Sequence, residues 1–189
     1  LEYMSGGSLD LMLSKMPKNK QISSSVAAGI AQGLHYLHGL GIVHCDLKSA
    51  NVLMKDKMFP EISDFGHAKV LPRLLTSSLA TVESEGTTGW MAPEVLRDGR
   101  SSKASDVYSF AVILWELATR RIPFAHDSRA SITQKVKAGE KPGDLLQIEG
   151  NTSVPYARLI ASCWKDRAKE RPTIESAETS LQEMKIKLS

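Results

Sequence analysis

One short segment of the sequence, residues 44–51, carries three polar side chains whose types and spacing suit a single kind of chemistry. Asp46 can take a proton from an attacking hydroxyl, Lys48 can offset phosphate charge, and Asn51 can give an oxygen to a hard cation. These three roles together describe phosphoryl transfer. We therefore interpret all three residues as catalytic, with Asn51 also a metal ligand.

Apolar residues frame this segment on both sides. Ile42 and Val43 precede it, and Val52 and Leu53 follow it. Bulky and β-branched residues of this kind are typical of short buried strands. The polar residues between them are therefore expected on a tight loop that two strands hold rigidly.

Three motifs in a fixed order carry a resemblance to a known family. Residues 44–51 resemble the protein-kinase catalytic loop H-R-D-L-x-x-x-N, with Cys45 where the family usually has Arg. Residues 64–66 read Asp-Phe-Gly and residues 92–94 read Ala-Pro-Glu, which are similar to the D-F-G and A-P-E motifs. The chain is thus identified as a member of the eukaryotic-type protein kinases.

Two further positions bear on the substrate that this resemblance implies. Lys48 and Thr87 stand where Ser/Thr kinases of the family carry Lys and Thr, whereas tyrosine kinases differ at both positions. Residues 46–53 and 86–94 look most like the tyrosine-kinase-like group of Ser/Thr kinases. The implied reaction is transfer of the γ-phosphoryl group of ATP, with Mg²⁺, to protein Ser or Thr hydroxyls.

The resemblance also implies a fold and a division of the chain. The expected class is mainly α within the α+β protein-kinase-like fold, with a helical C-terminal lobe and short β-hairpins around the catalytic loop. Residues 1–189 would form a partial kinase domain. Its expected parts are the hinge at 1–8, the catalytic loop at 44–51, the activation segment at 64–94 and the C-terminal helices at 105–187.

Nucleotide-binding residues are implied near the start of the chain and around the catalytic loop. Leu1 would stand at the gatekeeper position, and the backbones of Glu2 and Met4 would pair with adenine. The remaining implied contacts are Ser8 at the ribose, Leu53 beneath adenine and Asp64 on magnesium. Asn51 would supply the second metal position.

A Gly-x-Gly-x-x-Gly loop is absent from the sequence, as are the strand Lys and helix Glu that kinases place before the hinge. We therefore expect that the small N-terminal lobe is not within these residues and that the fragment alone is inactive. A non-catalytic kinase-like binding module is the alternative hypothesis. Retention of Asp46, Lys48, Asn51 and Asp64 favours the enzyme, because a binding module has no chemical need of all four.

Apolar periodicity predicts the elements that must support the loop. Residues 23–39 carry apolar side chains at helical spacing, and residues 105–118 are apolar enough to run through the core. Later helices are expected at 128–138, 153–164 and 173–187. Residues 67–91 are rich in Ser, Thr and Leu without a clear period, which predicts a loop rather than a packed element.

Several ionisable residues are expected to be structural. Asp106 would be a buried acid, and the family satisfies this acid with backbone amides of the catalytic loop. Arg171 resembles the last fixed Arg of the family, which pairs with the acid at Glu94. The resemblance also implies that His44 braces the loop.

His35 and His38 lie on the predicted helix at 23–39, three residues apart. They form a conceivable metal pair, but without a third ligand nearby the sequence favours packed or surface histidines.

Composition limits the classes of partner. The 189 residues, 42% of them apolar, fit one globular domain, and a net charge of +3 with scattered basic residues does not predict a nucleic-acid face. The two cysteines, Cys45 and Cys163, lack the spacing of a disulfide framework or zinc site. No apolar run approaches the roughly 18 residues of a membrane span. We expect a cytoplasmic chain, or the intracellular part of a larger protein, with ATP and a Ser/Thr-containing protein as partners.

Overall fold

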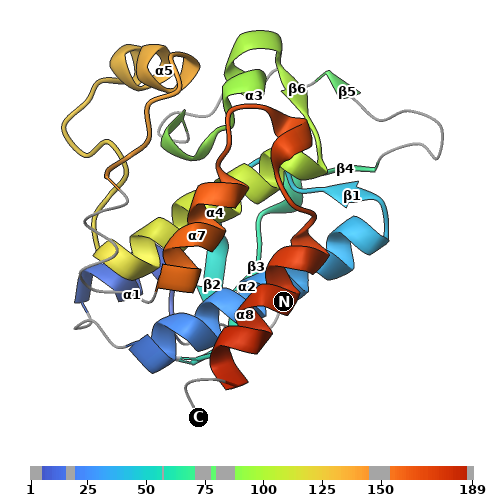
Figure 1. Cartoon of the computed structure of the whole chain (residues 1–189), viewed down its shortest axis with the longest axis vertical. Coiled ribbons are helices and arrows are strands. Elements are labelled where there is room, and N and C mark those ends of the chain that lie inside the picture. Colours follow the sequence, from blue (N-terminus) through green and yellow to red (C-terminus); the bar gives the residue numbers. More distant parts are fainter. Residues whose placement is uncertain are drawn as a thin grey trace.

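Figure 1 shows the computed structural model of the chain, in which helices dominate and the strands are short. The structure describes residues 6–15, 20–56, 58–70, 78–79, 88–144 and 154–186. The predicted hinge residues Leu1, Glu2 and Met4 and the predicted Thr87 lie outside the described residues.

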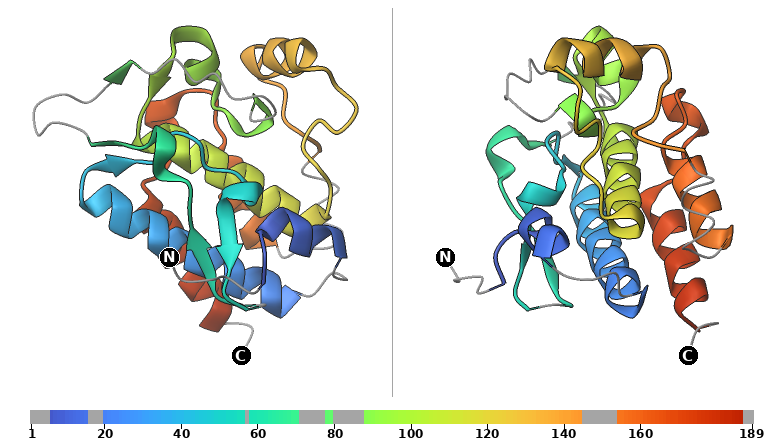
Figure 2. Two further views of the ribbon diagram at one scale, coloured as in Figure 1. Left: turned by 180° about the vertical axis from the view of Figure 1, so that it is seen from behind. Right: turned by 90° about the vertical axis from the view of Figure 1, so that its left-hand side faces the viewer.

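The longest helices pack side by side around a buried one. This central helix, α4, spans Lys103–Thr119, and α2 (Lys20–Gly39) and α7 (Val154–Cys163) both contact it. Helix α8 (Ile174–Ile186) in turn contacts α2 and α7. The right-hand view of Figure 2 shows these helices together, with the strands near the catalytic loop and α1 on one side of them. The other α-helices among the described residues are α1 (Leu9–Lys15), α3 (Pro93–Asp98) and α5 (Arg129–Lys137).

Helix α4 is buried because its side chains are apolar on nearly every face. Val107, Phe110 and Leu114 are at most 1% exposed, and they belong to the continuous core. Ser102 caps the N-terminus: its hydroxyl accepts from the Ser105 amide at 3.3 Å, and its own amide donates to the Ser105 hydroxyl at 2.9 Å. The predicted core helix at 105–118 is confirmed, with slightly wider ends.

In the described residues, three two-stranded antiparallel ribbons hold the segments around the loop. Strand β1 (Ile42–Val43) pairs with β4 (Lys69–Val70), β2 (Val52–Met54) with β3 (Pro60–Ile62), and β5 (Ser78–Leu79) with β6 (Arg100–Ser101). Strands β1 and β2 contain the apolar residues predicted as strands. They do not pair with each other, so each anchors one end of the loop to a different partner.

Close packing brings the β2–β3 hairpin against α2. A Cβ atom built at Gly29 would lie 2.7 Å from the Pro60 side chain, which is nearer than packed carbon atoms approach. Glycine at this position therefore lets β3 sit directly on the helix. The hairpin is therefore fixed relative to α2. The position of Ser63, the residue that follows β3, is fixed in the same way.

The prediction of a loop without packed elements over residues 67–91 is wrong in three places. Within the described part, β4 and β5 are paired strands, and the 3-10 helix η3 (Thr88–Trp90) packs against α4 and α5. Strands of two residues are too short to produce an apolar period, and their partners are distant in sequence. The described part of the chain also contains the 3-10 helices η1 (Ser49–Asn51), η2 (Phe65–His67) and η4 (Ala168–Glu170).

The remaining predicted helices, at 23–39, 128–138, 153–164 and 173–187, are confirmed as α2, α5, α7 and α8. None of the helices in the described ranges combines the length and apolar character that crossing a bilayer requires.

Candidate functional site

A buried carboxylate of α4 holds the start of residues 44–51. The backbone amides of His44 and Cys45 donate to Asp106 Oδ2 and Oδ1 at 2.9 and 3.0 Å. His38 Nε2 lies 2.9 Å from the same Oδ2, so helix α2 is tied to this carboxylate as well. Cys45 adopts a left-handed φ of 69°, which makes the turn that presents both amides to one side chain. The predicted structural role of Asp106 is confirmed.

His44 braces the loop from inside. Its Nδ1 accepts from the Asp46 amide at 3.3 Å, so the proton of the neutral ring belongs on Nε2. Nε2 in turn lies 2.9 Å from the carbonyl oxygen of Ser63, which is the residue that follows β3. The ring thus connects the loop to the segment that carries Asp64.

Asp46 is held from two sides through one of its two oxygens. Oδ2 accepts from Lys48 Nζ at 2.9 Å and from Asn51 Nδ2 at 3.0 Å, and Asn51 Nδ2 also donates to the Asp46 carbonyl at 2.8 Å. Oδ1 is buried and has no hydrogen-bond partner in the part of the chain that the structure describes. The three residues predicted as catalytic are therefore brought together, with one carboxylate oxygen left without a donor.

The β2–β3 pairing places Asp64 beside the catalytic loop. Ser63 donates from its amide and its hydroxyl to the Asn51 carbonyl, both at 2.9 Å. Asp64 follows with a left-handed φ of 61° and an exposed side chain. Both Asn51 side-chain bonds use its nitrogen, so its Oδ1 and the Asp64 carboxylate are available oxygen ligands. Hard oxygen donors of this kind fit magnesium.

The predicted nucleotide residues Ser8 and Leu53 are neighbours across an antiparallel bridge. The Gly6 amide donates to the Met54 carbonyl at 2.9 Å, and the Met54 amide donates to the Gly7 carbonyl at 2.8 Å. A Cβ at Gly6 would lie 2.4 Å from that Met54 oxygen, so this pairing requires glycine. The Ser8 hydroxyl donates to Asp10 at the start of α1.

A second ion pair anchors residues 92–94. Arg171 donates to both oxygens of Glu94, at 2.6 and 2.7 Å, and its side chain is fully buried. Three carbonyls, of Ala104, Lys165 and Asp166, accept the remaining Arg171 bonds. The predicted pairing of Arg171 with Glu94 is confirmed, and its burial makes it a structural anchor rather than a weak surface contact.

The contacts of two side chains with this site were not predicted from the sequence, although His38 was expected to be a packed or surface histidine. His38 joins Asp106, as described above, and Glu116 of α4 accepts from Ser49 Oγ at 2.9 Å and Trp90 Nε1 at 2.8 Å. His35, the other histidine weighed as a metal ligand, lies 2.7 Å from Glu178 of α8. An acid within the apolar run of residues 110–118 was the available signal for Glu116.

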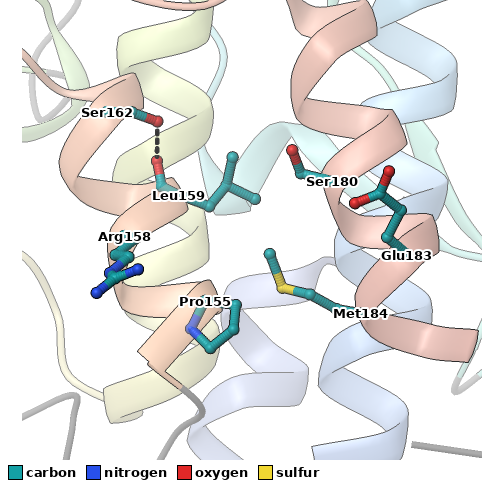
Figure 3. A pocket seen from close by; sticks show the side chains of 7 residues that line it. All are labelled: Pro155, Arg158, Leu159, Ser162, Ser180, Glu183 and Met184. Atoms are coloured by element: carbon teal, nitrogen blue, oxygen red, sulfur yellow. Dashed lines mark hydrogen bonds between the residues drawn. The ribbon is translucent and has the colours of Figure 1, made fainter. Parts of the chain in front are cut away.

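A pocket of about 360 Å³ lies elsewhere, between α7 and α8. Figure 3 shows Leu159, Pro155 and Met184 at its walls, with Arg158 and Glu183 on opposite sides. It shares no lining residue with the catalytic loop or with residues 64–66. The candidate site is therefore the loop and its surroundings, not this pocket.

Comparison with known proteins agrees with the motifs. The family described as "Protein kinase domain" matches residues 1–181. Serine/threonine-protein kinase CTR1 of Arabidopsis thaliana is 41% identical over 179 residues, which cover 91% of this chain and 21% of that protein. Serine/threonine/tyrosine-protein kinase HT1 of the same plant is 35% identical over 179 residues, covering 90% of this chain and 43% of that protein.

A probable LIM domain-containing serine/threonine-protein kinase of Dictyostelium discoideum is 34% identical over 178 residues, covering 92% of this chain and 26% of that protein. The chain therefore spans less than half the length of each of these relatives. The matched range contains the catalytic loop and both other motifs, and the resemblance to Ser/Thr kinases is confirmed. The chain belongs to the protein kinase family.

Proposed function

We propose that this chain is the large lobe of a Ser/Thr protein kinase that transfers the γ-phosphoryl group of ATP to protein Ser or Thr hydroxyls. The observation that carries the proposal is the hydrogen bonding of the Asp46 carboxylate. Lys48 and Asn51 occupy Oδ2, whereas the buried Oδ1 lacks a donor among the described residues. A buried acceptor without a donor is destabilising, and a substrate hydroxyl is a donor of the right kind.

Each residue then has a defined part in the reaction. The substrate hydroxyl gives its proton to Asp46 Oδ1 while its oxygen forms a bond to the γ-phosphorus. The bond between that phosphorus and the ADP oxygen breaks, and the electron pair leaves with ADP. The Lys48 ammonium, already beside Asp46, offsets charge on the transferred group.

The nucleotide and metal residues follow the same proposal. Ser8 and Leu53, bridged in the structure, would border ribose and adenine, with the Glu2 and Met4 backbones at the adenine edge. Asn51 Oδ1 and Asp64 would hold magnesium, which neutralises phosphate charge when bound. In this proposal residues 1–189 form a partial kinase domain with the parts predicted from the sequence. The domain would act on a protein substrate in the cytoplasm.

The test uses a complete kinase domain that contains this chain and a Ser-containing peptide. Asp46→Asn removes the base and Asp64→Asn weakens the metal site, so each variant should lose roughly 10²- to 10⁴-fold in phosphate transfer. Asp56→Asn is the matched control, because the bonds that Asp56 makes to described residues are those it accepts from the Met58 and Phe59 amides in the hairpin turn.

Turnover within a few-fold of the parent in both site variants would refute the assignment. A folded parent domain that binds partners but incorporates no phosphate would instead favour the non-catalytic module.

A further inference from the structure

Another pocket of about 360 Å³ lies where α2 ends and where α4 and α8 begin. Its lining residues fall within 35–39, 103–107 and 171–175, and none of them belongs to the catalytic loop or to residues 64–66. Val107 and Ile174 are buried in the walls, which are mainly apolar. A cavity of this size, apolar with a few placed polar groups, is typical of a small-molecule site.

His38 contributes a buried nitrogen of this wall that lacks a hydrogen-bond partner among the described residues. The side chain is 5% exposed, and its Nε2 lies 2.9 Å from Asp106 Oδ2. Both Asp106 oxygens also accept backbone amides, so Nε2 is the donor in this contact. In the neutral ring Nδ1 is then an acceptor, and no described residue donates to it. A buried acceptor without a donor is unfavourable, so an O–H or N–H group of a ligand would be stabilised there.

Other polar groups of the walls are already engaged within the described residues. Arg171 has five N–H donors. Two of them reach the oxygens of Glu94 and three reach backbone carbonyls, so none is left for a ligand. The Thr173 hydroxyl is bonded to the Ser176 hydroxyl and accepts from its amide. His38 is therefore the buried group that a ligand can satisfy.

Lys103 supplies a positive charge at the edge of the pocket. It is exposed, it opens α4, and no described residue bonds to its ammonium group. A cation at a helix N-terminus is repelled by the helix dipole, so an anion beside Lys103 would be stabilised. Glu175 also lines the pocket, but it lies in the first turn of α8, where the helix dipole already complements its charge. His35 is matched by Glu178, 2.7 Å away.

We propose that this pocket binds a small aromatic acid that carries a hydroxyl or N–H group at its other end. The ring lies between the apolar walls, the hydroxyl or N–H group donates to His38 Nδ1, and the carboxylate faces Lys103. A hydrogen bond accepted at Nδ1 also polarises the donation from Nε2 to Asp106. The site is separate from the proposed kinase function and does not rest on it.

The first experiment compares two probes by NMR titration of the 189-residue chain. Para-hydroxycinnamate carries both polar ends and should bind with a dissociation constant of about 1 mM or tighter. Para-methoxycinnamate has the same ring and acid but cannot donate a hydrogen bond. It should bind about tenfold more weakly, because the Nδ1 acceptor then stays unsatisfied.

The second experiment narrows the pocket. A Cβ atom built at Gly39 meets no atom within 4 Å, so Gly39→Leu should fold, and it places a larger side chain at the pocket wall. Ala104→Leu narrows the pocket from the side of α4. Both variants should lose saturable binding of para-hydroxycinnamate. Gly39→Ala, which adds one carbon at the same position, is the control and should bind like the native chain.

The charge is tested separately. Lys103→Met should weaken binding of para-hydroxycinnamate by about threefold, as expected for an exposed ion pair. Lys169→Met is the matched control, since Lys169 is also exposed and does not line the pocket.

Nitrogen-15 NMR identifies the acceptor directly. The His38 Nδ1 resonance, assigned by comparison with His38→Gln, should shift when para-hydroxycinnamate is added and much less when para-methoxycinnamate is added. Urea unfolding shows which variants are folded, and if one Leu variant fails to fold, the other decides.

The proposal is overturned if para-hydroxycinnamate shows no saturable binding or if the two cinnamates bind equally. It is also overturned if every folded Leu variant binds like the native chain, if Lys103→Met binds no more weakly than Lys169→Met, or if the Nδ1 resonance stays unchanged at saturation. The comparison of the two probes requires no variant, so it decides even if neither Leu variant folds.

Discussion

Replacing Glu116 by Gln should remove a pH dependence of stability that the native chain carries. The folded-state pKa of Glu116 is raised by burial from an ordinary 4.5 to about 8, so the folded chain holds this proton more tightly than the unfolded chain. For a raised pKa, the stabilising contribution is complete below 4.5 and is lost as the pH rises through about 8. The free energy of unfolding should therefore fall with increasing pH in this window.

The size of the effect follows from the linkage relation. Each pH unit between the two pKa values changes the free energy of unfolding by about 1.4 kcal/mol, tapering near the upper one. Between pH 6 and pH 8 the native chain should therefore lose about 2 kcal/mol relative to Glu116→Gln. Because other groups titrate equally in both chains, the difference between them isolates this carboxyl group.

Urea unfolding at half-unit pH steps measures this difference. Glu183→Gln on α8 is the matched control, since it makes the same chemical change at an exposed position. A difference between native and Glu116→Gln that stays constant within about 0.5 kcal/mol from pH 6 to pH 8 would refute the reasoning.

Three other predictions concern different parts of the chain. Arg171→Ala should lower the free energy of unfolding by roughly 3–5 kcal/mol, because Glu94 loses its buried partner; a loss below about 1 kcal/mol in urea unfolding would contradict this. Burial raises the pKa of the Cys45 thiol to about 11, and a neutral thiol cannot pair with phosphate, so kinase activity should survive phosphatase treatment. The prediction is disproved if phosphatase treatment abolishes activity and the Cys45→Arg variant depends on phosphorylation to the same extent as the native chain. Calorimetry of the 189-residue chain should show only weak ATP binding, since the sequence contains no Gly-rich loop and Phe65 is 48% exposed; a low-micromolar affinity would reject it.

Local signals in the sequence were sufficient for the helices and for the burial of Asp106. Helix α4 follows from its continuous apolar character, and the burial of Asp106 follows from its place on that helix. The pairing of Arg171 with Glu94 came from the family resemblance, since nothing in the spacing joins residues so far apart in sequence. The site geometry became clear only with the backbone pairing of β2 and β3.

The strands β4 and β5 and the role of Glu116 were not predicted, for a common physical reason. Each depends on hydrogen bonds between residues that are distant in sequence, and such contacts produce no apolar period. Glu116 nevertheless left a usable signal, because a lone acid beside Leu114, Trp115 and Leu117 must find partners once the helix is buried. What the signal could not identify was which segments supply those partners.

Two acids of α4 bind the catalytic loop at two separate points. Asp106 and Glu116 are ten residues apart, which corresponds to about 15 Å along a helix at about 1.5 Å per residue. The loop residues that they bind, Cys45 and Ser49, are four apart, and a chain of that length reaches about 14 Å at most. The loop need not be fully extended to match, because these contacts are made through side chains; Lys48 is extended at φ −155°, whereas Cys45 is left-handed at φ 69°. The rigid helix beneath the loop fixes both contacts, and the hydrogen bonds from Lys48 and Asn51 to Asp46 set the spacing of the side chains between them.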